Sequence, residues 1–170
     1  LADLPLGEGG ADRRVVMQAP KNGFFYVLDA ADGELISATP FTAQNWTTGE
    51  FDENGRPVLI EEAVDLALYA VVPGPTGAHN WHPMAFNPDT GLVYIPVNEI
   101  PFFYDKTRNV ENSKSWWNVG YDVAAGWPVE YPAGTLDAVA DLDGGSLLAW
   151  DPVKAEPRWA VPFALPLNGG

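Results

Sequence analysis

The chain alternates short apolar runs with clusters of turn-forming residues. The clearest runs cover 24–28, 92–95 and 159–161, and shorter ones stand at 35–36 and 147–148. Glycine, proline, asparagine and aspartate separate these runs. Short apolar runs with such boundaries are typical of β-strands joined by tight turns. The pattern therefore predicts an all-β chain.

One turn pattern occurs three times at the end of an apolar run. An Asp or Asn is followed four positions later by a Gly or, in the third copy, by an Ala: Asp29 with Gly33, Asn87 with Gly91, and Asp151 with Ala155. An Asp or Asn side chain accepts hydrogen bonds from the backbone of a turn, and glycine supplies the positive φ that a reversal needs. We expect a β-hairpin at each copy.

The spacing of these copies predicts the architecture. The positions 29, 87 and 151 are 58 and 64 residues apart. A unit of that length accommodates one four-stranded sheet and a loop, as in a propeller blade. We predict a partial β-propeller of about three blades, with residues 1–170 forming one piece of a single propeller domain and no internal domain boundary. A solenoid or a sandwich would show a similar repeat.

Three blades cannot close a ring, and their outer faces would need further sequence to cover them. We therefore expect the chain to be an internal piece of a larger propeller. Three segments lie between the repeats. Residues 45–57 are rich in turn formers and predict a superficial loop, residues 61–72 fit a helix or a strand equally, and residues 101–134 hold many aromatic side chains. The last segment is predicted to form a functional wall or a domain contact.

Composition and charge exclude several classes of protein. Among 170 residues, 46% are hydrophobic and 12% aromatic, which excludes a disordered chain. The net charge of −14 repels phosphate backbones, so we expect no nucleic-acid partner. The chain has no cysteine, which removes disulfides, thiolate metal ligands and cysteine nucleophiles from consideration.

Two segments carry candidate chemistry. Lys21 stands at the start of the apolar run 24–28, and Asn80 and Trp81 lie between two histidines in the segment His79–Met84. A ring next to an amide suits a flat molecule with polar edges, and a lysine supplies a cationic contact. From the residues alone, an exposed lysine and a packed loop explain the same features.

Other chemistry finds less support in the sequence. His79 and His82 are a possible metal pair, but Pro83 argues against a helix and no third ligand is suitably spaced. Both are predicted to be structural histidines that bond backbone groups. The carboxylates at 3, 12, 61, 62, 141 and 143 lie in polar sequence and are expected to be solvated. The glycines of residues 7–10 are expected to have neither a strand before them nor a helix after them, so they form no dinucleotide fingerprint.

The segments Pro20–Phe25 and His79–Met84, in this order and at this distance, resemble the pyrroloquinoline-quinone (PQQ) dependent alcohol dehydrogenases of the quinohaemoprotein type. The stretch from Ala149 to Trp159 is similar to the tryptophan-docking motif of quinoprotein propellers. The resemblance implies that Lys21 hydrogen-bonds the quinone edge of PQQ. It also implies that Asn80 bonds polar atoms of the cofactor and that Trp81 contacts it. No catalytic residue and no metal ligand is expected within this chain.

The same resemblance implies an eight-bladed periplasmic propeller that holds PQQ and calcium and oxidises primary alcohols to aldehydes. Its electrons pass to a haem c domain or a cytochrome c. The family's aspartate base and calcium ligands lie upstream of the lysine segment, so this piece is expected to supply part of the PQQ-pocket wall and to be inactive alone. A non-catalytic propeller that serves as a binding or assembly scaffold would explain the repeats equally well, but not the two matching segments.

Overall fold

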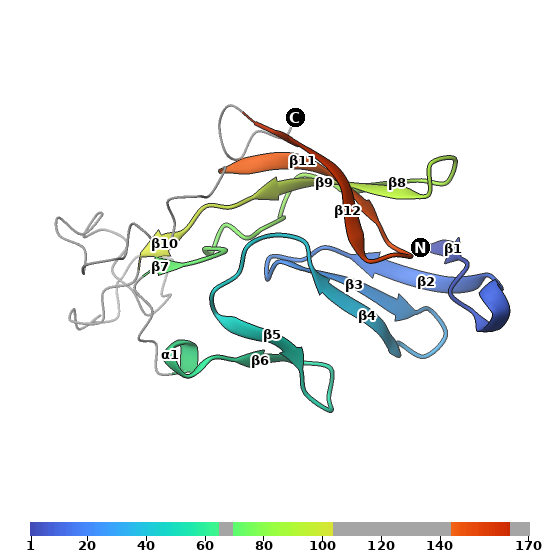
Figure 1. Ribbon diagram of the computed structural model, residues 1–170, viewed down its shortest axis with the longest axis horizontal. Coiled ribbons are helices and arrows are strands. Elements are labelled where there is room, and N and C mark those ends of the chain that lie inside the picture. The colour runs from blue at the N-terminus through green and yellow to red at the C-terminus, as the bar shows by residue number, and fades with distance from the viewer. Residues whose placement is uncertain (65–69, 104–143, 164–170) are drawn as a thin grey trace, which may run out of the picture.

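The computed structural model describes residues 1–64, 70–103 and 144–163 (Figure 1). Within these ranges nearly all regular structure is β-strand, which confirms the predicted class. The exceptions are a 3-10 turn at Glu8–Gly10 and a four-residue helix, α1, at Glu61–Val64. No helix of the described residues is long and apolar enough to cross a membrane.

Two antiparallel sheets of four strands form the body of the molecule. The first has the order β1-β2-β3-β4 and the second β12-β11-β9-β8. Their strands are β1 (Ala2–Leu4), β2 (Arg13–Gln18), β3 (Phe24–Asp29) and β4 (Leu35–Pro40), and β8 (Ala85–Asn87), β9 (Leu92–Asn98), β11 (Gly145–Asp151) and β12 (Glu156–Pro162). Two smaller pairs are β5 (Thr47–Phe51) with β6 (Pro57–Leu59), and β7 (Ala70–Val71) with β10 (Phe102–Phe103).

The two four-stranded sheets bury one hydrophobic core between them. Phe25 and Val27 of β3 belong to the same buried cluster as Val93 and Ile95 of β9 and Trp150 of β11. The rings of Phe25 and Trp150 lie 5.7 Å apart between centroids and join the sheets directly. The alternating pattern of β9, in which Val93, Ile95 and Val97 are buried, follows from this one-sided burial.

Strand β3 is covered on its other face as well. Phe24 contacts Phe51 of β5 with ring centroids 4.9 Å apart and Trp46 at 6.0 Å, and Tyr26 lies 6.1 Å from Phe51. The apolar run 24–28 therefore does not alternate, because both faces of the strand are buried. The segment 45–57, predicted as a superficial loop, forms the hairpin β5–β6 that supplies this cover (Figure 1).

The predicted turn geometry is confirmed in all three copies. Gly33, Gly91 and Ala155 have φ of 81°, 68° and 55°. The side chains of Asp29 and Asn87 accept hydrogen bonds from backbone N–H groups two residues later, at 2.6 and 2.9 Å. Asp151 accepts hydrogen bonds from the backbone N–H groups two and three residues later, at 3.1 and 3.0 Å. Ala155 therefore adopts the left-handed conformation that glycine provides elsewhere.

The partial propeller is supported, but the turn copies do not correspond to one blade each. The second and third copies belong to the same sheet, because β11 pairs with β9 from Trp150 opposite Val93 to Gly145 opposite Asn98. The 64-residue spacing thus reflects a long insertion between two paired strands rather than a new sheet. The spacing of the copies along the chain cannot distinguish an insertion within one sheet from the start of a new sheet. Most of this insertion, including the aromatic segment from residue 104 onward, lies outside the described residues.

Two further expectations meet the structure in part. The segment 61–72 forms α1 and, after residues outside the description, strand β7. The strand β1 does precede the glycines of residues 7–10, contrary to expectation, and a 3-10 turn follows it.

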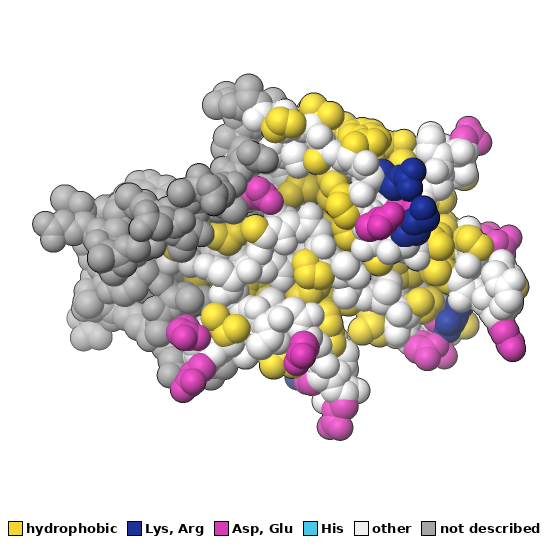
Figure 2. Space-filling model, viewed as in Figure 1, with side chains coloured by type: hydrophobic (Ala, Val, Ile, Leu, Met, Phe, Trp, Pro, Cys, Tyr) yellow, Lys and Arg dark blue, Asp and Glu magenta, His cyan; other side chains and the backbone are white. Residues whose placement is uncertain are grey.

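Strand β12 is exposed along its length, and Figure 2 shows hydrophobic side chains gathered over β11 and β12. Trp159 remains 43% exposed there and lies 5.8 Å from the ring of Tyr94.

The turns predict opposite effects for two exchanges between glycine and alanine. Gly91→Ala places a side chain in a left-handed conformation in open space and should destabilise the protein by about 1 kcal/mol. Ala155→Gly removes the same strain and should leave the stability unchanged or raise it by up to about 1 kcal/mol. Urea unfolding midpoints of the full-length protein measure both. Equal losses for the two variants would contradict the turn assignment.

The Asp29 carboxylate predicts a dependence of stability on pH. Hydrogen bonds from the Ala31 backbone and from Arg13 hold the pKa of Asp29 below its ordinary value, with the Arg13 contact at 2.5 Å. A lowered folded-state pKa stabilises the protein above the unfolded value of about 3.9, and this contribution is lost as the pH falls further. Between about pH 5 and pH 3, the wild type should therefore lose more stability than Asp29→Asn. Parallel pH profiles would contradict the assignment.

Candidate functional site

The fold brings the two candidate segments into direct contact. The turn between β2 and β3 contains Lys21. The backbone carbonyl of Lys21 accepts a hydrogen bond from the N–H of Ala78 at 3.0 Å. The carbonyl of Ala78 accepts one from the N–H of Asn98, at the end of β9, at 2.7 Å. Residues separated by more than fifty positions are thus fixed to each other through backbone bonds. These bonds connect the two main sheets at one end.

Gly77 allows this close approach. A Cβ atom at this position would lie 2.4 Å from Cγ, 2.7 Å from Cβ and 2.9 Å from Cα of Lys21. These separations are far shorter than any van der Waals contact, so a side chain at residue 77 would displace the lysine turn. The glycine also has φ of 83°, which side chains rarely adopt. No local signal in the sequence reveals the contact of Gly77 with Lys21.

Lys21 is exposed, with its stem against Gly77 and its ammonium group near the loop that follows β7. The Nζ atom donates a hydrogen bond to the carbonyl of Pro75 at 3.1 Å. No carboxylate pairs with Lys21 within the part of the chain that the structure describes. The positive charge is therefore held in place without a counter-ion from these residues, and two of its three donors remain available.

Asn80 also keeps bonding capacity. Its Nδ2 atom donates to the carbonyl of Thr76 at 3.1 Å, while its Oδ1 atom has no hydrogen-bond partner among the described residues. Trp81, the next residue, is 88% exposed. A tryptophan with this exposure does not contribute to a core. The alternative in which Trp81 packs as a core residue and Asn80 caps a turn does not hold for Trp81.

His79 connects the two segments through its ring. Its Nδ1 atom lies 2.6 Å from the carbonyl oxygen of Ala19, and its Nε2 atom lies 2.6 Å from the carbonyl oxygen of His82. Carbonyl oxygens only accept hydrogen bonds, so a proton on either ring nitrogen finds an acceptor in place. The predicted structural role is confirmed for His79 but not for His82, whose ring makes no hydrogen bond among the described residues. The described residues contain no group of three or more side chains suited to a metal ion.

A cavity of about 260 Å³ opens at the contact between the segments. Its lining residues are Gln18, Ala19, Pro20, Lys21, His79, Asn80 and Met84. Lys21 and Asn80, predicted as site residues, thus line the same cavity. Trp81 does not line it. Pockets for small ligands are usually about 300–1,000 Å³, so these residues fit one wall of a site better than a complete one.

Gln44 packs close to Gly23 in the lysine turn. Its Nε2 atom would be 2.8 Å from a Cβ at Gly23, and both polar atoms of its amide are buried without a partner among the described residues. Thr42 nearby in the chain donates a hydrogen bond to Glu99 at 2.7 Å. The turn with Lys21 is therefore packed against Gln44 at Gly23 and against Gly77 at Lys21. Neither residue was identified from the sequence.

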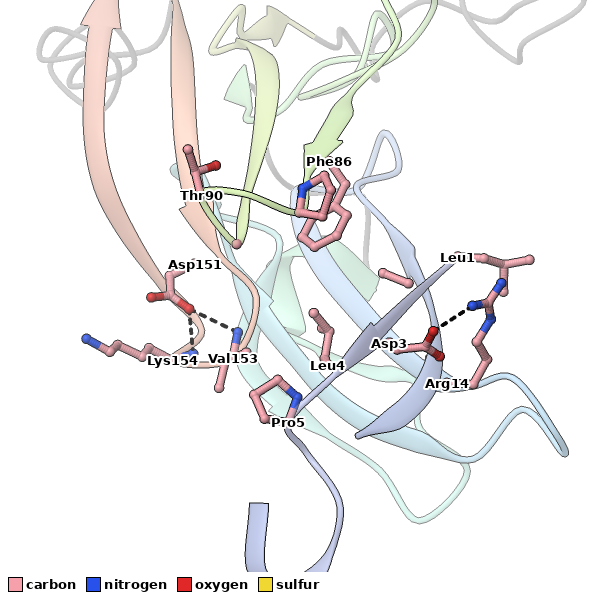
Figure 3. Close-up of a pocket in the computed structure, with 13 residues that line it drawn as sticks. Leu1, Asp3, Leu4, Pro5, Arg14, Phe86, Thr90, Asp151, Val153 and Lys154 are labelled. Atoms are coloured by element: carbon pink, nitrogen blue, oxygen red, sulfur yellow. Dashed lines mark hydrogen bonds and ion pairs between the residues drawn. The ribbon is translucent and has the colours of Figure 1, made fainter. Parts of the chain in front are cut away.

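A larger opening of about 730 Å³ lies between β1 and the turns that join β8 to β9 and β11 to β12 (Figure 3). Its charged side chains are largely committed to local contacts. Asp3 pairs with Arg14 at 2.8 Å, and Asp151 accepts hydrogen bonds from the backbone of its own turn. Lys21 and Asn80 do not line this opening. The candidate site therefore lies in the smaller cavity.

Comparison with known proteins matches the whole of this chain to one part of larger enzymes. No family model matches the chain. The chain is 43% identical to the quinohaemoprotein alcohol dehydrogenase ADH-IIG of Pseudomonas putida and 40% identical to the quinohaemoprotein alcohol dehydrogenase of Comamonas testosteroni. Both matches cover 100% of this chain, but only 24% and 23% of those proteins. The chain therefore spans about a quarter of the length of these relatives.

Solved structures agree with these matches. The structure of ADH-IIG from Pseudomonas putida superposes with a TM-score of 0.75 at 42% identity, covering 100% of this chain and 25% of that one. A europium-containing methanol dehydrogenase superposes with a TM-score of 0.66 at 25% identity, covering 92% of this chain and 26% of that one. The resemblance to quinohaemoprotein alcohol dehydrogenases is confirmed, for a segment of about one quarter of their length.

The packing of Gly77 against Lys21 predicts a local effect of substitution. Gly77→Ala should displace the lysine turn and break the bond from the Ala78 amide to the Lys21 carbonyl, and hydrogen exchange at Ala78 should rise at least about tenfold. Gly91→Ala is the matched control, because it has the same positive φ but nothing within 4 Å of the added Cβ. Unchanged exchange at Ala78 in Gly77→Ala would contradict the contact.

Proposed function

We propose that this chain, which matches a quarter-length segment of quinohaemoprotein alcohol dehydrogenases, forms part of the cofactor wall of a PQQ- and calcium-dependent dehydrogenase that oxidises primary alcohols to aldehydes. The observation that carries the proposal is that Lys21 and Asn80, which are 59 positions apart in the sequence, line one cavity. The match of this whole chain to about a quarter of enzymes of this name also supports it.

The residues present fit such a cofactor. A flat quinone with carboxylate and carbonyl oxygens needs cationic and amide contacts around its edge. Lys21 has free donors and no carboxylate partner among the described residues, and Asn80 keeps its Oδ1 atom unbonded there. Trp81 presents an exposed ring beside Asn80 and is available for contact with a planar face.

When bound, PQQ supplies a quinone that takes two electrons from the alcohol. In this proposal the Lys21 ammonium group would hold the quinone edge of the cofactor by hydrogen bonding and would stabilise negative charge there. Asn80 bonds polar atoms of the cofactor and fixes its orientation. Trp81, whose exposed ring lies next to Asn80 in the chain, would contact the cofactor from outside the cavity. None of these residues takes the proton of the alcohol, so the catalytic base belongs to another part of the protein.

The remaining parts of the enzyme enter the proposal from the resemblance alone. Calcium ligands and the base would come from sequence outside this chain, as would the other blades of the propeller. Electrons would pass to a haem c domain or to a separate cytochrome c, and the enzyme would work in the periplasm. The names of the relatives, quinohaemoprotein alcohol dehydrogenases, are consistent with the alcohol and with the haem.

The proposal predicts a large effect of removing the Lys21 ammonium group. In the full-length protein loaded with PQQ and calcium, Lys21→Ala should lower alcohol-dependent dye reduction by about 10²-fold or more, as loss of a preorganised donor does elsewhere. Lys154→Ala is the control, because Lys154 is exposed at the β11–β12 turn and does not line this cavity.

Two results would contradict the proposal. Unchanged turnover and PQQ affinity in Lys21→Ala would remove the lysine from the cofactor site. A full-length wild-type protein that binds no PQQ in the presence of calcium would instead support a scaffold without catalysis.

A further inference from the structure

The ring of His79 spans the distance between the two site segments. One nitrogen meets the carbonyl of Ala19, two residues before Lys21, and the other meets the carbonyl of His82, two residues after Asn80. Both distances are 2.6 Å. Each contact is a hydrogen bond only when the ring nitrogen in it carries a proton, so a neutral ring donates one of them and the doubly protonated ring donates both. The rigid five-membered ring thus lies between the backbone just before the lysine and the backbone just after the asparagine.

These contacts add to one backbone hydrogen bond. The N–H of Ala78 bonds the carbonyl of Lys21, which fixes one point between the segments. A single bond permits rotation about it, whereas a second anchor removes that freedom. The contact from His79 to Ala19 is the second anchor, and the contact to His82 closes the loop that carries Asn80 and Trp81. Residues 77–84 contain no helix or strand, so no ladder of backbone bonds holds them.

We infer that His79 is a positioning residue, which sets the relative placement of Lys21 and Asn80 by bridging the carbonyl groups of Ala19 and His82. The role in cofactor binding rests on the function proposed above, while the bridge itself does not. The ring also lines the cavity, so its loss would open the wall at the place where the two segments meet. Misplacement of catalytic groups by about 1 Å can lower rates about 10²-fold.

Three substitutions separate the two anchors. In His79→Asn the amide nitrogen takes the place of Nδ1 and keeps the link to Ala19. In His79→Gln the amide nitrogen takes the place of Nε2 and keeps the link to His82. His79→Leu removes both. His82→Gln is the matched control, because the ring of His82 makes no hydrogen bond among the described residues and its backbone carbonyl is retained.

The first readout is hydrogen exchange at the Ala78 amide in the full-length protein without PQQ. We expect His79→Leu to increase this exchange at least tenfold, His79→Asn to stay near the wild type, and His82→Gln to leave it unchanged. Urea unfolding midpoints show whether His79→Leu remains folded. If it does not, His79→Gln, which keeps the loop but loses the Ala19 link, takes its place. Wild-type exchange in both His79→Leu and His79→Gln would overturn the inference.

The second readout is the affinity of the full-length protein for PQQ in the presence of calcium, together with kcat and KM. His79→Leu should weaken PQQ binding and lower kcat about 10- to 100-fold with little change in KM for the alcohol. In a Lys21→Ala background the same substitution should have much less effect, because both changes act on one interaction. Full additivity of the two substitutions would overturn the positioning role.

The two readouts distinguish the possible failures. Wild-type protein that binds no PQQ would refute the proposed function, while faster exchange at Ala78 in His79→Leu would still support the bridge. Normal PQQ affinity in a His79→Leu variant with faster exchange would refute the role toward the cofactor and leave Lys21 in place as a ligand.

Discussion

The burial of β3 on both faces is the constraint on which the rest of the structure depends. Phe25 joins the first sheet to Trp150 of the second, and Phe24 holds the β5–β6 hairpin on the opposite side. Buried aromatic rings contribute more than any other side chains to such packing. Because β3 begins immediately after the lysine turn, clamping this strand fixes the position of Lys21. The position of Lys21 in the site therefore depends on the packing of the core around β3.

Local features of the fold could be predicted from the sequence, and non-local pairing could not. Each turn depends on residues four positions apart, so the motif that ends at Gly33, Gly91 or Ala155 contains all the information needed. The pairing of β11 with β9 depends on strands separated by a long insertion, and nothing in the spacing marks it. A 64-residue interval within one sheet and an interval between sheets look the same along the chain.

The candidate site shows the same division. Lys21 and the His79–Met84 segment were identifiable because their residue types and order resemble a known enzyme family. Gly77 and Gln44 were not, since their importance lies in contacts with residues more than twenty positions away. Likewise, the sequence could not show that Trp81 lies outside the cavity that Lys21 and Asn80 line. Exposure of one ring depends on the path of a whole loop.

The site divides its hydrogen-bonding capacity in a way that suits a ligand. Backbone groups are paired with one another, as between Ala78 and Lys21, and both ring nitrogens of His79 face carbonyl oxygens. The Lys21 ammonium group and the side-chain Oδ1 atom of Asn80 keep free hydrogen-bonding capacity among the described residues. A rigidly held backbone that leaves Lys21 and Asn80 free capacity is what preorganisation requires, because binding then need not reorder the groups that bind. A loop that only packed would pair these atoms internally.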